Sequence, residues 1–179
     1  MRLTWVQPED LVAHELVQGR AEGVDVSAVE AACSVTASDW QSAIPLLRKA
    51  VEPFDTVGPD YRAPAMDARR PSRTKSIEEL PVALGLVVLT GGSYSEAVLG
   101  GVNYGRDADS IASMAGAITG ALGGADAVPA QWRHDVSVAS KTDIEAPGRV
   151  MAALAAELAA ADEARAGARA SAMARLTDS

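Results

Sequence analysis

The sequence predicts an all-α protein with one main domain. Four segments place Ser three residues before Glu or Gln, which is the capping-box spacing of a helix N-terminus; they begin at Ser27, Ser38, Ser76 and Ser93. Aromatic residues make up only 4% of the chain while Ala and Gly are abundant, so we expect helices that pack by close backbone approach rather than around large rings. A chain of 179 residues with 48% hydrophobic content can bury a core of ordinary size.

The first helix is expected to begin at Pro8, because proline suits the first helical position and the two acids after it lie at the positive end of the helix dipole. Its buried face would carry Leu11, Leu16 and Val17. Further along, an apolar run over residues 80–92 ends in paired glycines. Periodicity alone does not separate a buried helix from a buried strand in such a run, but the capping box ahead of it favours a helix.

Residues 111–124 are expected to form a helix with two different faces. Apolar residues recur at helical spacing on one face, and glycines repeat every fourth residue on another; these are Ile111, Met114, Ile118 and Leu122, and Gly116, Gly120 and Gly124. The nearly bare glycine face would let another helix or a ligand come close. Membrane-helix dimers use the same glycine spacing, but about 20 apolar residues are needed to span a bilayer, and this uncharged run stops at Asp126.

Two further segments are not expected to contribute to the helical core. Residues 52–75 contain four prolines and a local basic excess, from Arg62, Arg69, Arg70, Arg73 and Lys75. This irregular stretch is either a solvated, flexible loop or a lid whose arginines meet a phosphorylated ligand. Residues 147–179 read as an Ala-rich terminal helix that frays or packs on a partner, which leaves residues 1–146 as the main domain.

Charge and cysteine content limit the partners and the compartment. The formal net charge of −8 argues against binding to nucleic acid or to an anionic membrane surface. Cys33 is the single cysteine, which excludes an internal disulfide and fits a reducing compartment, and we interpret it as a small core residue. The N-terminus meets two acids before any apolar run develops, so no signal peptide is expected and a cytoplasmic location is favoured.

A pair of acids precedes the glycine-rich helix, at Asp107 and Asp109, with the hydroxyl of Ser110 directly behind them. Asp109 or Ser110 is a natural N-cap, and that explains one of the acids but not both. In a non-helical lead-in beside Gly105, the two carboxylates could turn toward one point. Oxygen ligands of this kind suit a hard divalent cation such as magnesium or calcium and do not suit zinc.

An ordered series of motifs around these acids resembles the ADP-ribosylglycohydrolase family, which includes the dinitrogenase-reductase-activating glycohydrolases and the ADP-ribosyl-arginine and ADP-ribosyl-serine hydrolases. The features are a helix with a Leu-Pro start, a short amphipathic helix, an Asn-x-Gly-x-Asp-x-Asp-(Ser/Thr) loop, a small-residue helix and a Pro-x-x-Trp turn. They lie at Leu80-Pro81, 93–100, 103–110, 111–124 and 129–132. The likeness extends from Pro8 to Trp132 and is to the C-terminal half of the family domain only.

The resemblance implies an all-α, orthogonal multi-helix fold around two magnesium ions. The implied metal ligands are Asp107, Asp109 and Ser110, and the implied substrate-binding residues are Asn103, Gly105 and Arg106. The metals would hold the ribose hydroxyls of an ADP-ribosyl group and help to place a water against the anomeric carbon. That reaction would release ADP-ribose from a protein side chain or a small leaving group, so the partner is an ADP-ribosylated protein or an ADP-ribose-containing small molecule. Many members carry Gly at the position of Arg106.

One family feature is missing from the chain. The Thr-Asp-Asp motif that completes the metal cluster in the family occurs nowhere in the sequence, and the pattern alone identifies no catalytic residue. The chain therefore resembles a truncated domain, and we expect a homo-oligomer or a separate chain that supplies the N-terminal half. The alternative is a non-catalytic subunit of the same fold that binds ADP-ribose or metal, or that has a structural role.

Overall fold

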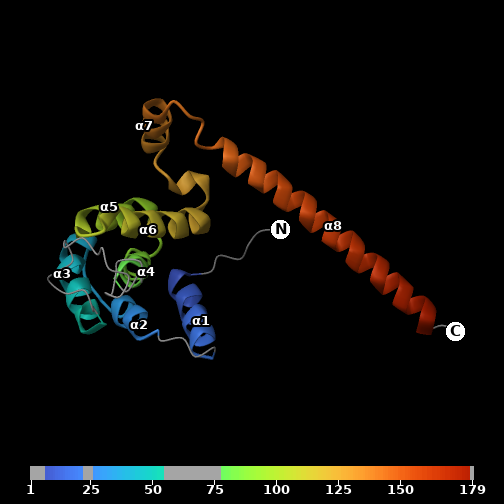
Figure 1. Cartoon of the computed structure of the whole chain (residues 1–179), viewed down its shortest axis with the longest axis horizontal. Coiled ribbons are helices and arrows are strands. Elements are labelled where there is room, and N and C mark those ends of the chain that lie inside the picture. Colours follow the sequence, from blue (N-terminus) through green and yellow to red (C-terminus); the bar gives the residue numbers. More distant parts are fainter. Residues whose placement is uncertain (1–6, 22–25, 55–77, 178–179) are drawn as a thin grey trace, which may run out of the picture. The chain divides into compact units, whose positions relative to one another are not determined.

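In the computed structural model, residues 7–21, 26–54 and 78–177 are described. Within these ranges all regular elements are helices and none is a strand, which confirms the all-α prediction (Figure 1). The α-helices are α1 (Pro8–Ala21), α2 (Ser27–Cys33), α3 (Trp40–Val51), α4 (Glu79–Leu89), α5 (Tyr94–Tyr104), α6 (Ala108–Gly123), α7 (Ala130–Ser140) and α8 (Ala146–Thr177). Two short 3-10 helices, η1 (Glu52–Phe54) and η4 (Ala125–Ala127), follow α3 and α6.

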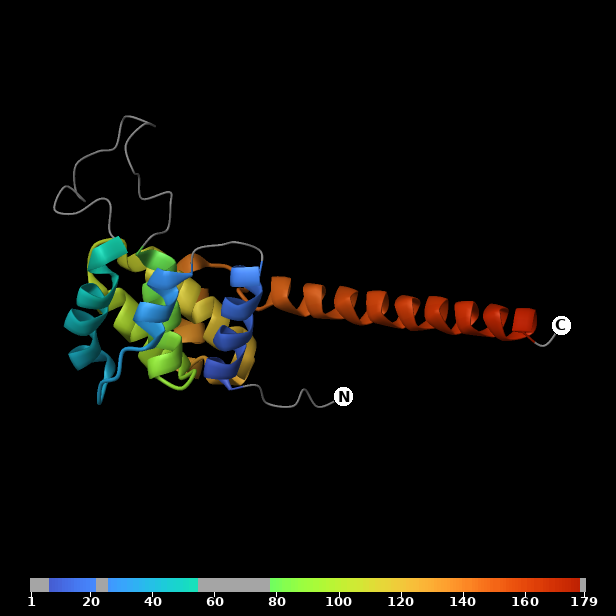
Figure 2. The ribbon, with the colours of Figure 1, turned by 90° about the horizontal axis from the view of Figure 1, so that it is seen from below.

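The chain divides into two compact units, Met1–Pro129 and Ala130–Ser179. The first contains α1 to α6 and the second contains α7 and α8. Figure 2 shows α8 as one continuous helix, and its described side chains from Pro147 to Arg175 are exposed to solvent. The helix begins at Ala146, one residue before the expected start of the Ala-rich terminal segment.

Helix α4 is the centre of the first unit. It packs against α1, α2, α3, α5 and α6, and its residues Val82, Ala83, Leu86 and Val87 are buried. Because a helix enclosed by neighbours needs no polar face, its apolar residues show no amphipathic spacing. The helix predicted for the apolar run is confirmed. It ends at Leu89 with Thr90 as its C-cap, and Gly91 and Gly92 then turn the chain with φ of 59° and 78°.

Helices α5 and α6 approach each other through small residues. A Cβ atom added at Gly101 of α5 would lie 2.7 Å from the Cα of Ala112 in α6. One at Gly116 would lie 3.1 Å from Val98 of α5. Of the expected glycine face, Gly116 and Gly120 are therefore covered by α5, whereas Gly124 follows the helix as its C-cap and a Cβ atom there would meet nothing within 4 Å. On the other face Ile111 is fully buried, and Met114, Ile118 and Leu122 pack against the core as predicted.

Several predicted helix starts differ from the observed ones. Helix α2 begins at Ser27 itself, with Val26 as its N-cap. Asp39, not Ser38, caps α3, because its carboxylate accepts from the Ser42 N–H at 2.7 Å. Ser93 is the N-cap of α5, although its side chain makes no capping hydrogen bond. Ser76 lies outside the described residues.

Helix α1 begins at Pro8 as predicted, but its buried face is different. Val12 is buried and Val17 is 66% exposed, so the expected burial of Val17 is wrong. Leu16 is half-buried. None of the described helices is long and apolar enough to cross a membrane. The basic residues of the 52–75 segment all lie outside the described residues.

Candidate functional site

The loop between α5 and α6 carries the acidic motif. Helix α5 ends at Tyr104 and α6 begins at Ala108. Between them, Gly105 and Arg106 have φ of 82° and 53°, so two consecutive residues have left-handed backbone conformations. Glycine adopts positive φ without steric cost, whereas arginine does not. Arg106 must therefore be held in this conformation by other contacts.

Glu78 provides those contacts. The Tyr104 hydroxyl and Arg106 Nη1 each donate a 2.7 Å hydrogen bond to the same oxygen, Glu78 Oε1. Glu78 is only 7% exposed, and a buried carboxylate is tolerated when it is paired with a charge and hydrogen-bonded. These bonds hold the start of α4 against the end of α5 and the loop that follows it.

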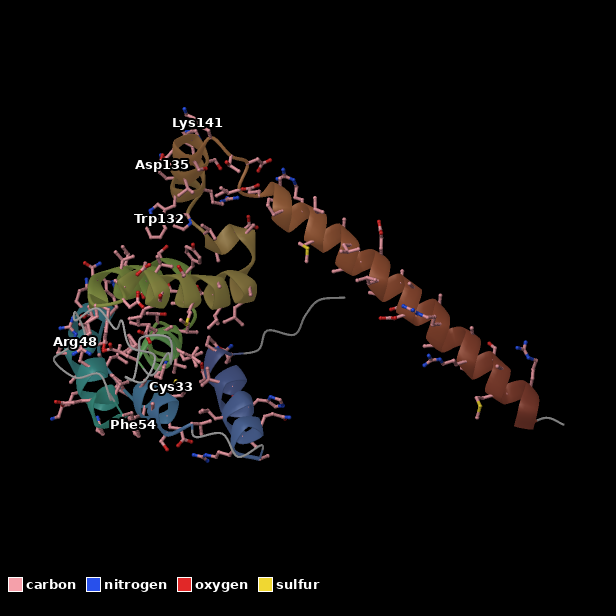
Figure 3. The ribbon with its side chains drawn as sticks, viewed as in Figure 1. Cys33, Arg48, Phe54, Trp132, Asp135 and Lys141 are labelled. Atoms are coloured by element: carbon pink, nitrogen blue, oxygen red, sulfur yellow. The ribbon has the colours of Figure 1, made fainter. Side chains whose placement is uncertain are left out.

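Arg48 of α3 supports the same loop from another element (Figure 3). Its guanidinium carbon lies 5.0 Å from the centre of the Tyr104 ring, and its Nη2 donates to the Tyr104 carbonyl oxygen. A Cβ atom at Gly105 would lie 3.2 Å from that same Nη2, so a larger residue would press on the guanidinium. Burial, followed by the hydrogen bond to Glu78 and the charge of Glu78, raises the pKa of Tyr104 and keeps its hydroxyl a proton donor.

Glu79 is the first residue of α4 and lies next to this cluster in the chain. It is 4% exposed, and its Oε2 atom is buried without a hydrogen-bond partner. Burial raises the pKa of Glu79, and the negative charges of Asp107 and Glu78 raise it further. The sequence analysis used Glu79 only as the last residue of the capping box that begins at Ser76, and it assigned no role to Glu78. The signal in the sequence was an acidic pair directly before the apolar run, because a helix that is buried on all sides also buries the residues at its start.

The predicted metal ligands lie at the start of α6. Asp107 is the half-buried N-cap residue, and its carbonyl oxygen accepts from the Ile111 N–H at 3.2 Å. Its side chain makes no capping hydrogen bond. Asp109 and Ser110 belong to the first turn of the helix, so the expectation that one of them is the N-cap and that both acids precede the helix is wrong. Asp109 is exposed and Ser110 is half-buried.

The other sequence-predicted residues take different positions. Asn103 lies on the exposed side of the last turn of α5, where its amide nitrogen donates to the Leu99 carbonyl at 2.8 Å. Gly105 and Arg106 form the loop itself. Among the described residues, no three His, Cys, Asp or Glu side chains are gathered so that they could hold a metal ion by themselves.

A separate cavity of about 450 Å³ lies between α1, α2 and α4. Its lining includes Cys33, Glu30, Val12 and Val88, and burial raises the pKa of Cys33 to about 11. The residues of the Asp107 loop are not among those that line it. This cavity is therefore distinct from the site described above.

Comparison of the sequence with models of protein families gives a match. The sequence model of the family described as ADP-ribosylglycohydrolase matches residues 10–174. The match includes all five motifs from Leu80 to Trp132 and continues into α8, beyond the extent of the resemblance expected from the motifs. Comparisons with curated proteins and with solved structures gave no match. The chain belongs to the ADP-ribosylglycohydrolase family.

Proposed function

We propose that the protein hydrolyses the glycosidic bond between ADP-ribose and a protein side chain or a small leaving group. Membership of the family suggests a hydrolase. The observation that carries the proposal is the anchoring of the acidic loop: Glu78 bonds both Tyr104 and Arg106, and Asp107 follows directly at the N-terminus of α6. A loop held in one conformation keeps its ligands pre-organised for binding.

Magnesium is the proposed cofactor, as a two-ion cluster held in part by Asp107, Asp109 and Ser110. The donor set fits, because all three side chains offer the oxygen ligands that magnesium prefers. The buried Oε2 atom of Glu79, which has no hydrogen-bond partner, also fits, because a nearby cation would give it one. When bound, the metals would orient the ribose hydroxyls and a water, and would stabilise developing charge.

The remaining loop residues would bind the nucleotide part of the substrate. The N-terminus of α6 offers backbone N–H groups and a positive dipole end to the pyrophosphate. Arg106 adds a positive charge beside them, with its side chain 34% exposed even though it pairs with Glu78. Asn103 would contact the substrate through its amide oxygen or its second amide N–H, since one N–H already donates to the Leu99 carbonyl.

Completion of the site is proposed to need a second set of ligands. The chain contains no Thr-Asp-Asp sequence, and the three proposed ligands alone would hold magnesium weakly. We propose that a separate chain or a second copy of this chain contributes the other ligands. The target is an ADP-ribosylated protein or a small molecule that contains ADP-ribose.

Titration calorimetry of ADP-ribose with and without magnesium tests the proposal. We expect magnesium-dependent binding to the wild type and its loss in an Asp107→Ala/Asp109→Ala variant. A matched control is Asp126→Ala/Asp135→Ala, which removes two exposed carboxylates outside the loop and should leave binding intact. Absence of binding under every condition would refute a working site in this chain. Binding without release of ADP-ribose from modified arginine or serine peptides would instead identify a non-catalytic ADP-ribose-binding subunit.

A further inference from the structure

The Glu79 carboxylate is a buried acid whose described contacts leave one oxygen unsatisfied. Glu79 is only 4% exposed, and its Oε2 atom accepts no hydrogen bond. A buried polar group without a partner is costly, and a charged one more so. As the first residue of α4, Glu79 benefits from the positive end of the helix dipole, but the dipole supplies no partner for Oε2.

The position of Glu79 is fixed relative to the acidic loop through its neighbour. Glu78 bonds Tyr104 and Arg106, which lie on either side of Gly105, and Arg106 directly precedes Asp107. The start of α4 is therefore held against this loop. Burial is the main cause that raises the pKa of Glu79, and the negative charge of Asp107 adds to it.

We infer that Glu79 is a further oxygen ligand, directly or through a bound water, of the divalent cation held by Asp107. Magnesium is commonly bound through one or two carboxylates and keeps several waters, so Glu79 would add a second carboxylate to the coordination that Asp107 begins. A cation where the start of α4 meets this loop would supply the partner that the buried Oε2 atom of Glu79 lacks. The inference rests on the proposed function, because it takes the Asp107 loop as the metal site.

Manganese is the probe for the test, since its bound and free forms are distinguished by electron paramagnetic resonance and it shares the oxygen preference of magnesium. Four metal-free proteins would be titrated with manganese: the wild type and the variants Glu79→Gln, Asp107→Asn and Glu96→Gln. The last removes an exposed carboxylate in the first turn of α5 and serves as the matched control. We expect manganese affinity to fall about tenfold or more in the first two variants and to stay unchanged in the control.

The outcomes separate the inference from the proposed function. If Asp107→Asn loses manganese while Glu79→Gln binds as the wild type does, Glu79 is not a ligand and the Asp107 site stands. If the wild type binds no manganese, the proposed metal site fails and the inference falls with it. Should Glu79→Gln fail to fold, Glu79→Asp replaces it; this variant keeps the charge but withdraws it by one methylene, and undiminished affinity there would overturn the inference.

Thermal unfolding gives a second readout that does not depend on activity. Magnesium should raise the unfolding midpoint of the wild type, because a ligand that binds only the folded state stabilises it. The shift should be much smaller in Glu79→Gln and preserved in Glu96→Gln. An equal shift in all three proteins would contradict a role for Glu79 in metal binding.

Discussion

The Tyr104 hydroxyl donates a 2.7 Å hydrogen bond to Glu78 Oε1, and this contact connects the last residue of α5 with the N-cap of α4. The Arg106 guanidinium binds the same carboxylate oxygen at 2.7 Å. The acidic loop thus depends on one buried carboxylate that belongs to another helix. Changes at either donor should therefore be measurable in both stability and loop conformation.

Replacement of Tyr104 by phenylalanine should lower the free energy of unfolding by about 1–3 kcal/mol, because Glu78 would keep Arg106 but lose its neutral donor inside the protein. The ring and its packing would remain, so the effect reports the hydroxyl. Urea unfolding followed by circular dichroism measures it. A change of less than about 0.5 kcal/mol, the level typical of surface substitutions, would show that the hydroxyl contributes little.

Two substitutions of Arg106 should separate the contribution of its side-chain contact to stability from the cost of its backbone conformation. Arg106→Ala removes the partner of a buried carboxylate and should destabilise the protein by a few kcal/mol. Arg106→Gly removes the same contact but relieves the positive φ of 53°, so it should be more stable than Arg106→Ala by about 1 kcal/mol. Equal stabilities of the two variants would contradict a backbone cost at this position.

Lys141 offers the matched control for that backbone effect. It follows the last residue of α7, has φ of 54° and is exposed. Glycine is the preferred residue at this position after a helix. Lys141→Gly should therefore stabilise the end of α7 by about 0.5–1 kcal/mol, because no buried ion pair is lost. Amide hydrogen exchange in the last turn of α7 would detect the slower opening.

Alanine at two glycines should have opposite effects. Gly101→Ala would bring a methyl group to 2.7 Å from the Ala112 Cα, where backbone would have to move. We expect a loss of about 1–3 kcal/mol in the free energy of unfolding. Gly167→Ala in α8 meets no atom within 4 Å and should increase helix stability by about 1 kcal/mol. Thermal unfolding and far-ultraviolet circular dichroism measure the pair; a stabilising Gly101→Ala would refute the close approach of α5 and α6.

Cys33 should react slowly with alkylating reagents near neutral pH. Burial raises its pKa to about 11 from an ordinary value of 9.0, and the thiolate is the reactive form. The alkylation rate of the folded protein should therefore keep increasing up to about pH 11, whereas unfolded chain should reach its plateau lower. Mass spectrometry of iodoacetamide-treated samples follows the rate. A midpoint near pH 9.0 in the folded protein, the ordinary value for this thiol, would contradict burial of the thiol.

The same pKa shift has a defined effect on stability. As pH rises through 9.0, the unfolded chain loses the Cys33 proton before the folded protein does. Stability contributed by the protonated thiol is therefore present below that pH and is lost as pH rises toward about 11. A Cys33→Ala variant should lack this part of the pH dependence. An identical slope in both proteins between those pH values would assign it to other groups.

The sequence by itself determined the helical class, the family and the position of the motif series. Apolar spacing located the buried face of α6, and the apolar run of residues 80–92 identified α4, because hydrophobic periodicity and capping signals are local properties of the chain. The sequence located the helix starts less well. Asp39 and Ser38 compete as caps at adjacent positions, and only the actual backbone angles decide which side chain reaches the free N–H groups.

Only the tertiary structure decided which charged groups surround the acidic loop. Glu78 and Tyr104 are 26 residues apart in sequence, and Arg48 and Tyr104 are 56 apart. No spacing rule connects them, because their contact depends on how α3, α4 and α5 pack around the core. Burial of Glu79 arises in the same way: its place beside an apolar helix was visible in the sequence, but the loss of water around its carboxylate results from the helices that enclose α4.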